Sequence, residues 1–184
     1  ATGGIFGEFS AEHLETRKMI SNSTVSGSTN VGGIVGLHYD GRIAEAVSKG
    51  DVSGSINVGG FVGNMNLAAT FIEGSYSTAS VTAGTNGSGF AGSIIASATI
   101  QNSWYDPSFL AGAATLSPAT GLVGNLVMVG SDTARTGLIQ TTLTQLQNDS
   151  VFFGANFNSI DPFIFNAGDY PRPYFEVYPQ YFND

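Results

Sequence analysis

The chain contains two histidines and no cysteine, so its candidate metal ligands and nucleophiles are few. His13 lies in the segment Ala11-Glu12-His13-Leu14-Glu15, which lacks the second histidine of a zinc-protease helix. His38 lies in the connection formed by residues 37–40, where we expect a solvated side chain. The lack of cysteine excludes thiolate metal sites, and no Gly-x-Ser-x-Gly elbow supplies a hydrolase nucleophile. The sequence therefore predicts no metal site and no cofactor, with calcium left open at turns such as Asp40-Gly41.

Carboxylates are the remaining candidates for catalysis, because β-helix enzymes that act on polysaccharides use clustered acids or bases on one face. The candidate acids are scattered along the chain, at Asp40, Glu45, Asp51, Glu73 and Asp106. Glu45 and Glu73 follow Ile43 and Ile72, but by two residues and by one, so in strands they should point to different sides. We therefore expect no catalytic residues and no enzymatic activity, with a Glu45–Glu73 pair as the less favoured alternative.

Composition and charge exclude several kinds of partner. Only 11% of the residues are charged, the net charge is −8, and six residues are Lys or Arg. Nucleic acids require a basic stripe and anionic membranes also attract basic residues, so neither partner is expected. No apolar run approaches the roughly 20 residues that span a bilayer. With 25 glycines and many Ser, Thr and Asn residues, the chain is typical of a β protein with many turns.

A glycine-rich motif recurs along residues 1–106. Gly3-Gly4-Ile5-Phe6-Gly7 returns as Gly32-Gly33-Ile34-Val35-Gly36, as Gly59-Gly60-Phe61-Val62-Gly63, and more weakly as Ser88-Gly89-Phe90-Ala91-Gly92. The copies are 29, 27 and 29 residues apart. A period of this length, with apolar runs too short for helices, predicts the coils of a solenoid. The predicted fold is therefore all-β, a short parallel β-solenoid (β-helix) of about four coils over residues 1–106.

Other positions keep the same phase and define the predicted core. One coil cannot bury its own apolar side, so like residues of successive coils should stack about 4.8 Å apart. The predicted core residues are Ile5, Ile34, Phe61, Phe90, Val25, Val52, Val81, Ile43, Ile72 and Ile100. The predicted corner residues, where glycine allows positive φ and close backbone approach, are Gly4, Gly33, Gly60 and Gly89. A phosphate-binding loop is the alternative, but that loop needs a strand-to-helix context and usually a lysine.

Residues 107–184 lack the repeat and form a predicted flanking and capping region. An apolar run at residues 121–129 favours an added strand on the solenoid flank, with a sticky edge for a partner chain as the alternative. Residues 141–147 have the pattern of a short helix capped by Thr141 or Thr142. The dense aromatic residues that follow should plug the C-terminal end of the core, and a carbohydrate-binding platform is the alternative.

At the repeat the chain resembles the GLUG-motif family. The matching segments are Val31-Gly32-Gly33-Ile34-Val35-Gly36 with Gly41-Arg42-Ile43, Val58-Gly59-Gly60-Phe61-Val62-Gly63, and Ile100-Gln101-Asn102-Ser103-Trp104-Tyr105-Asp106. The resemblance covers residues 1–106, and residues 143–175 are similar to the segment that often follows the last repeat. Family members are parts of large bacterial surface and secreted proteins, including adhesins and the non-catalytic region of IgA-cleaving peptidases. The resemblance implies a fold and an extracellular location, and it carries over no catalytic residues.

The expected function is a non-enzymatic structural or adhesive module, secreted or on a bacterial cell surface. The chain begins within a coil, so we expect an open, self-associating edge at Gly3, Gly4, Ile5, Phe6 and Gly7. Its protein partner would be upstream coils of the same polypeptide, or a second subunit stacking head to tail into a filament. One alternative is a carbohydrate-binding module whose exposed rings, Trp104, Tyr105, Tyr174 or Tyr178, bind a surface glycan. A polysaccharide-acting enzyme is a third, less favoured alternative.

Overall fold

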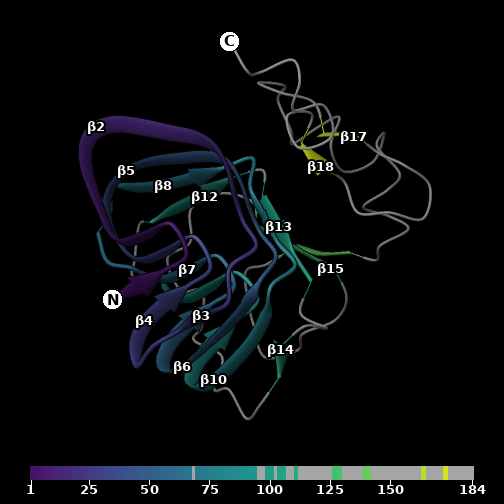
Figure 1. The fold of residues 1–184 in the computed structure, drawn as a ribbon. Helices are drawn as coiled ribbons and strands as arrows, with labels where there is room; N and C mark the ends of the chain where they lie inside the picture. Colours follow the sequence, from purple (N-terminus) through teal and green to yellow (C-terminus); the bar gives the residue numbers. More distant parts are fainter. Residues whose placement is uncertain are drawn as a thin grey trace.

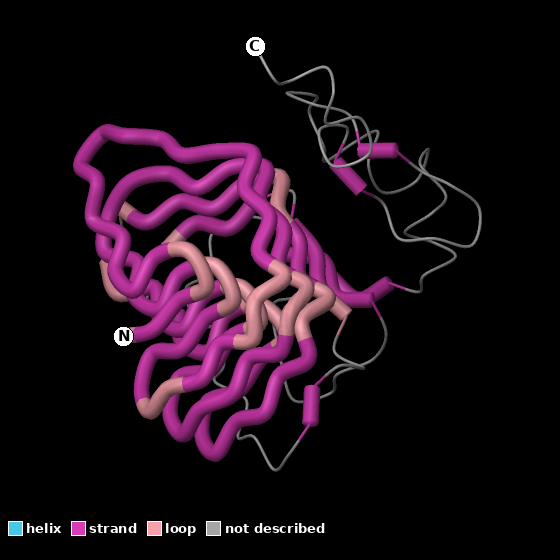
Figure 2. The backbone as a smooth tube through the Cα atoms, in the orientation of Figure 1, coloured by secondary structure: helices cyan, strands magenta, loops and turns pink. Residues whose placement is uncertain are grey.

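The computed structural model describes residues 1–67, 69–94, 98–101 and 103–106, and the short segments 110–111, 126–129, 139–141, 163–164 and 172–173. Within these residues the chain forms strands joined by short bends and turns, and no helix (Figure 2). The all-β class predicted from the glycine-rich, low-charge composition is therefore confirmed for the described part of the chain.

The strands are short except where they follow a whole side of the coil. The two longest, β2 and β5, contain 16 and 14 residues. In chain order the described strands are β1 (Thr2–Gly3), β2 (Phe6–Ser21), β3 (Val25–Ser26), β4 (Thr29–Gly32), β5 (Val35–Ser48), β6 (Asp51–Gly59), β7 (Val62–Met65), β8 (Thr70–Glu73), β9 (Tyr76–Ser77), β10 (Ser80–Ser88), β11 (Ala91–Ile94), β12 (Thr99–Gln101), β13 (Ser103–Tyr105), β14 (Leu110–Ala111), β15 (Leu126–Val129), β16 (Ile139–Thr141), β17 (Phe163–Ile164) and β18 (Arg172–Pro173).

These strands wind into a parallel β-solenoid of about three turns (Figure 1). Thr2 is aligned with Val31, Val31 with Val58, and Val58 with Gly87. We therefore name residues 2–30 the first coil, 31–57 the second coil and 58–86 the third coil, with a further partial turn from residue 87. The predicted solenoid is confirmed, although the complete turns are fewer than the four expected from the motif.

The strands of successive coils form two parallel sheets. One contains β1, β4, β6 and β10 side by side, and the other contains β2, β5, β7 and β11 together with β8, β9, β12 and β13. β2 pairs with β5 from Phe6–Val35 to Ser21–Ser48, with register shifts between Phe9 and Glu15. Those shifts accommodate the two extra residues that the first coil has over the second.

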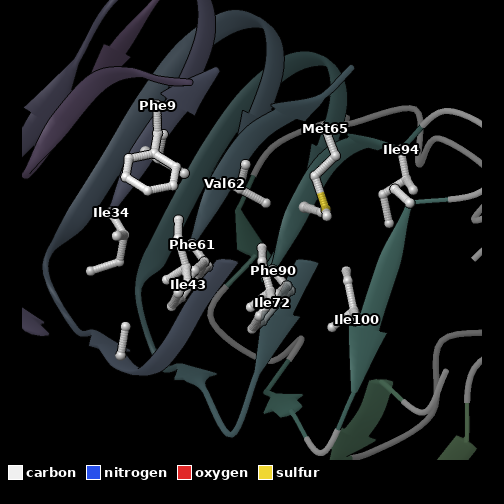
Figure 3. Packing of buried hydrophobic residues seen from close by; sticks show 14 of the residues in the cluster. Phe9, Ile34, Ile43, Phe61, Val62, Met65, Ile72, Phe90, Ile94 and Ile100 are labelled. Carbon is white, nitrogen blue, oxygen red and sulfur yellow. The ribbon is translucent and has the colours of Figure 1, made fainter. Parts of the chain in front are cut away.

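The core lies between the sheets and is built from rows of like residues. Figure 3 shows two rows that point inward, Ile34–Phe61–Phe90 and Ile43–Ile72–Ile100. The rings of Phe61 and Phe90 are stacked, 4.7 Å apart and 3° from parallel, a contact that contributes about 0.5–1.5 kcal/mol beyond the burial of area. A smaller cluster holds the valine row Val25, Val52 and Val81 with Val31, Val58, Ala79 and Ala83.

Burial agrees with the predicted core at nine positions and departs from it at one. Ile34, Phe61, Phe90, Val25, Val52, Val81, Ile43, Ile72 and Ile100 are each at most 5% exposed. The prediction was wrong for Ile5, which is 40% exposed. Ile5 belongs to the first coil, and within the described residues no further coil lies over its outer side.

The corner glycines are required for close packing, and the predicted positive φ was wrong. Among described glycines only Gly41 and Gly74 have positive φ. A Cβ on Gly33 would lie 2.0 Å from Ser48 Oγ and 2.3 Å from the Gly60 carbonyl oxygen. A Cβ on Gly4 or Gly60 would likewise lie 2.2 Å from the carbonyl oxygen of the next coil's glycine. Any side chain at these corners would therefore force successive coils apart.

Positive φ is instead adopted by rows of other residues. Asn30, Asn57 and Asn86 have φ of 53°, 54° and 54°, and they lie one above the other. Asn57 Nδ2 donates to Asn30 Oδ1 at 2.9 Å, and Asn86 Nδ2 donates to Asn57 Oδ1 at 2.8 Å. Asparagine tolerates the left-handed region better than most residues, so this row supplies both the backbone shape and a hydrogen-bonded ladder.

Strand stacking continues after residue 106, although the sequence repeat stops there. β14 pairs with β10, β15 pairs with β13, and β16 pairs with β15, all in parallel. Residues 126–129 of the predicted apolar strand thus extend the solenoid within the chain. Thr141, one of the two predicted helix caps, is the last residue of β16. The rest of the predicted helix and most of the aromatic cap lie outside the described residues.

Candidate functional site

Five charged side chains of the solenoid gather on one flank, where β2, β5 and β8 lie side by side. Glu15 is aligned with Arg42, and Arg42 with Phe71 of the next coil. Arg42 contacts Glu73 through a short ion pair, lies 3.5 Å from Glu15 and sits over the Phe71 ring at 5.1 Å. Its guanidinium therefore ties the first, second and third coils together.

A second arginine completes this cluster. Arg17 Nε donates to Glu15 Oε1 at 2.7 Å, and its Nη1 lies 3.4 Å from Glu45 Oε1. We name Glu15, Arg17, Arg42, Glu45 and Glu73 the ion-pair cluster. It contains two guanidinium groups and three carboxylates, and each carboxylate has an arginine within ion-pairing distance.

The two glutamates considered as a catalytic pair lie in this cluster but at different register positions. Ala44, not Glu45, is aligned with Glu73. Glu45 has φ of 52° and is 6% exposed, and it belongs to a row of positive-φ residues that includes Lys18 and Gly74. Glu45 pairs with Arg17, whereas Glu73 pairs with Arg42. Each of the two glutamates therefore forms an ion pair with an arginine of the preceding coil.

His38 is buried, contrary to the solvated side chain expected from its type. It is fully inaccessible in the second coil, aligned with Phe9 of the first coil and Met65 of the third. Its ring centroid lies 5.4 Å from that of Phe9. The Gly41 carbonyl lies 3.1 Å from Nε2, and a carbonyl only accepts, so Nε2 carries the proton of the neutral ring. Burial lowers the pKa of His38 from 6.5 to about 4, against smaller opposing effects of Gly41 and Asp40.

The first coil leaves one side of the solenoid open within the described part of the chain. β1 pairs only with β4, and β2 pairs only with β5. The exposed apolar residues there are Ile5, Leu14 and Ile20, at 40%, 65% and 41% exposure, with Phe6 and Met19 half-buried beside the core. The residues named as a self-association edge, Gly3 to Gly7 in the first motif, thus lie along an unpaired strand edge.

The rings proposed for glycan stacking are not exposed where the structure describes them. Trp104 and Tyr105 are 0% and 1% exposed. Trp104 stacks on Tyr76 with ring centroids 4.5 Å apart and 3° between planes, and Tyr105 lies against Phe90. These two rings extend rows of the solenoid. Tyr174 and Tyr178 lie outside the described residues.

Neither a metal-binding cluster nor a membrane-spanning helix occurs in the described part of the chain. No group of three or more His, Asp or Glu side chains is close enough there to hold a metal ion. No helix of that part has the length and apolar character needed to cross a bilayer. The asparagine row was the main feature that sequence reasoning missed, although Asn precedes the motif as Asn30-Val31-Gly32, Asn57-Val58-Gly59 and Asn86-Gly87-Ser88.

Comparison with known proteins found no matching family model, no matching curated protein and no matching solved structure.

Proposed function

We propose that this chain is a non-enzymatic structural and adhesive module of a bacterial surface or secreted protein, in keeping with its resemblance to the GLUG-motif repeats. In this proposal residues 1–106 form the solenoid, and residues 107–184 flank it and close its C-terminal end with a short helix and aromatic side chains. No cofactor takes part. The solenoid holds an attachment surface away from the cell and resists unfolding.

The observation that carries this proposal is the use of polar and charged side chains to join coils. The asparagine row links three coils by amide hydrogen bonds. The ion-pair cluster links the same three coils through Arg17 and Arg42. Ser75 Oγ accepts from the Ala46 amide of the second coil, and Ser103 Oγ accepts from the Ser75 amide. Such side chains favour a stiff stack, because each one constrains the spacing of neighbouring coils.

The sheet of β4, β6 and β10 offers an attachment surface that does not involve Trp104 and Tyr105, which are buried. Thr29, Ile56 and Thr85 are exposed in one aligned row. The one charged residue of these three strands is Asp51, at the start of β6. This surface keeps glycan binding as a second candidate function through hydroxyl and amide hydrogen bonds.

The proposal is tested with beads that carry the purified chain and a panel of immobilised glycans and matrix proteins. We expect attachment to at least one surface, lost in the unfolded variant Phe61→Ala and kept in Ser93→Thr, a conservative change on the half-buried outer part of β11. In parallel, soluble polysaccharides are incubated with the chain and new reducing ends are measured. Release of reducing ends that Glu73→Gln abolishes would overturn the non-enzymatic assignment.

A further inference from the structure

We infer that the open side of the first coil is a docking surface for one further coil of the same Gly-Gly-x-x-Gly repeat, stacked in parallel and in register on β1 and β2. This inference rests on the proposed function as a structural module and names the partner of its open edge. The partner is defined by its chemistry: glycine at two fixed positions, apolar residues between them, and an unpaired C-terminal strand edge.

The first argument concerns Gly7, the last glycine of the first motif. Its counterparts in later coils are sterically confined: a Cβ on Gly36 would lie 2.4 Å from the Thr2 amide nitrogen and 2.7 Å from the Gly7 carbonyl oxygen. A Cβ on Gly63 or Gly92 would lie 2.5 Å from backbone atoms of the preceding coil. For Gly7 the nearest atom is the Ala1 carbonyl oxygen at 3.5 Å, an ordinary contact.

The confinement of Gly36, Gly63 and Gly92 comes in each case from the preceding coil. At Gly7 the corresponding space holds no described atom at clashing distance, so the chain itself does not require glycine there. A coil stacked in register would require it, because its backbone would lie where Thr2 and Gly7 lie beside Gly36. Gly7 therefore fits a role in which another coil covers it.

The second argument concerns what the surface can accept. Each of Gly4, Gly33 and Gly60 places its missing Cβ 2.2–2.3 Å from the carbonyl oxygen of the glycine in the following coil. A coil arriving over the first coil would meet the Gly4 carbonyl oxygen in the same way, so only glycine fits there. The partner must also carry apolar residues over Ile5 and Phe6, which lie at the open end of the core.

The third argument is continuity with the stacking already present. Ile5 and Phe6 both donate their amides to the Ile34 carbonyl, and Ile34 and Val35 donate theirs to the Phe61 carbonyl. An added coil would continue this row by donating to the Ile5 carbonyl. The described C-terminal end of a second copy is less suitable, although β11 and β12 each have an open edge there. At its Gly89 corner a Cβ would lie 2.5 Å from the Tyr105 ring, so that ring occupies the space that the next coil's glycine takes at Gly33 and Gly60. We therefore assign the surface to a coil with an open edge.

The test is an extended protein in which a copy of residues 31–56 is fused directly before Ala1. Ala1 then takes the place of Asn57, and the added coil has the length of the second coil. We expect the thermal midpoint to rise and the amides of the added Ile34 and Val35 copies to exchange as slowly as the originals. Placing valine at the added copy of Gly33 should abolish both effects, because its side chain would clash with the Gly4 carbonyl.

Gly7→Val is the matched probe of the docking surface itself. In the native chain it should leave the thermal midpoint unchanged within about 2 °C, because the site has room and valine suits a strand. In the extended protein it should remove the protection of the added coil. Protection that survives Gly7→Val, or an added coil that exchanges freely without it, would refute the inference.

Light scattering of the native chain tests whether a second copy of the chain fills the docking surface. A dimer that Gly7→Val disperses would show that a second copy fills the surface and would overturn the assignment made above. Failure of the added coil to dock, with bead attachment of the native chain intact, would reject the docking surface and leave the proposed function standing. Loss of bead attachment, with the added coil docked, would reject the proposed function and leave the docking surface standing.

Discussion

Acidification should destabilise this protein through His38, a neutral imidazole inside the core. The ring lies in one row with Phe9 of the first coil and Met65 of the third coil, and it is fully buried. Burial lowers its pKa to about 4, compared with 6.5 for an ordinary histidine. Between these two values the unfolded chain binds a proton that the folded chain excludes. Stability is therefore complete above about pH 6.5 and falls as the pH is lowered towards about 4.

The size of this effect follows from the displacement of the pKa. Each pKa unit corresponds to about 1.4 kcal/mol. At about pH 4.5 most of the difference between 6.5 and about 4 has been expressed, so His38 should cost about 2–3 kcal/mol of unfolding free energy relative to about pH 7. Because the side chain is fully inaccessible, solvent screening does not reduce this figure.

The assay is urea unfolding at about pH 7 and about pH 4.5, on the wild-type chain and on His38→Met. Methionine is chosen because Met65 occupies the aligned position of the third coil. At neutral pH the variant loses the hydrogen bond to the Gly41 carbonyl, a cost of about 0.5–1.5 kcal/mol. On acidification it should lose about 2–3 kcal/mol less than the wild type, because it lacks the buried imidazole that must be protonated.

His13→Gln is the matched control, because it removes the chain's other histidine and keeps His38. It should show the full acid-induced loss of the wild type. The reasoning about His38 is refuted if His38→Met loses as much stability on acidification as the wild-type chain does.

Substitutions at Asn57, Gly33, Gly7 and Phe61 test the stacking itself by urea unfolding. Asn57→Ala breaks two amide hydrogen bonds and leaves alanine at φ of 54°, so it should cost about 2–4 kcal/mol; Asn57→Gly should cost less, and equal losses would contradict the role of backbone conformation. Gly33→Ala places a Cβ 2.3 Å from the Gly60 carbonyl oxygen and should cost more than about 3 kcal/mol of unfolding free energy. Gly7→Ala should change the unfolding free energy by less than about 1 kcal/mol. Similar effects at the two glycines would contradict the steric argument. Phe61→Leu removes a stacked ring at 0% exposure and should cost about 1–3 kcal/mol, and a neutral result would show that the core row repacks freely.

Several features that were mispredicted could have been found from the register of the repeat. His38 shares its row with Phe9, Met65 and Ile94, three apolar residues whose spacing follows the repeat. Its residue type favoured exposure, but its row dictated burial. Trp104 likewise continues the row of Val47 and Tyr76. Its position in the repeat therefore predicts burial, although a tryptophan side chain is also typical of a sugar-binding site.

Other features depend on backbone geometry that no spacing reveals. Glu45 and Glu73 were rightly expected at different register positions, but their arginine partners come from neighbouring coils. The positive φ of Glu45 redirects its side chain, and nothing in the residue type indicates that conformation. An added strand was predicted at residues 121–129, where β15 lies. The sequence did not indicate that β14, β15 and β16 continue the parallel stacking, because the chain keeps pairing there without repeating its sequence.

The sequence by itself determined the period, the parallel stacking and nine of the ten core positions. It could do so because like residues at intervals of 27 and 29 superpose only when successive coils run in the same direction. The tertiary structure alone decided why the glycines are needed, which charges pair, and that Ile5 is 40% exposed at the open end of the core. These outcomes depend on distances between neighbouring coils. The space around a glycine and the partner of a charged side chain are both set by the position of the neighbouring coil.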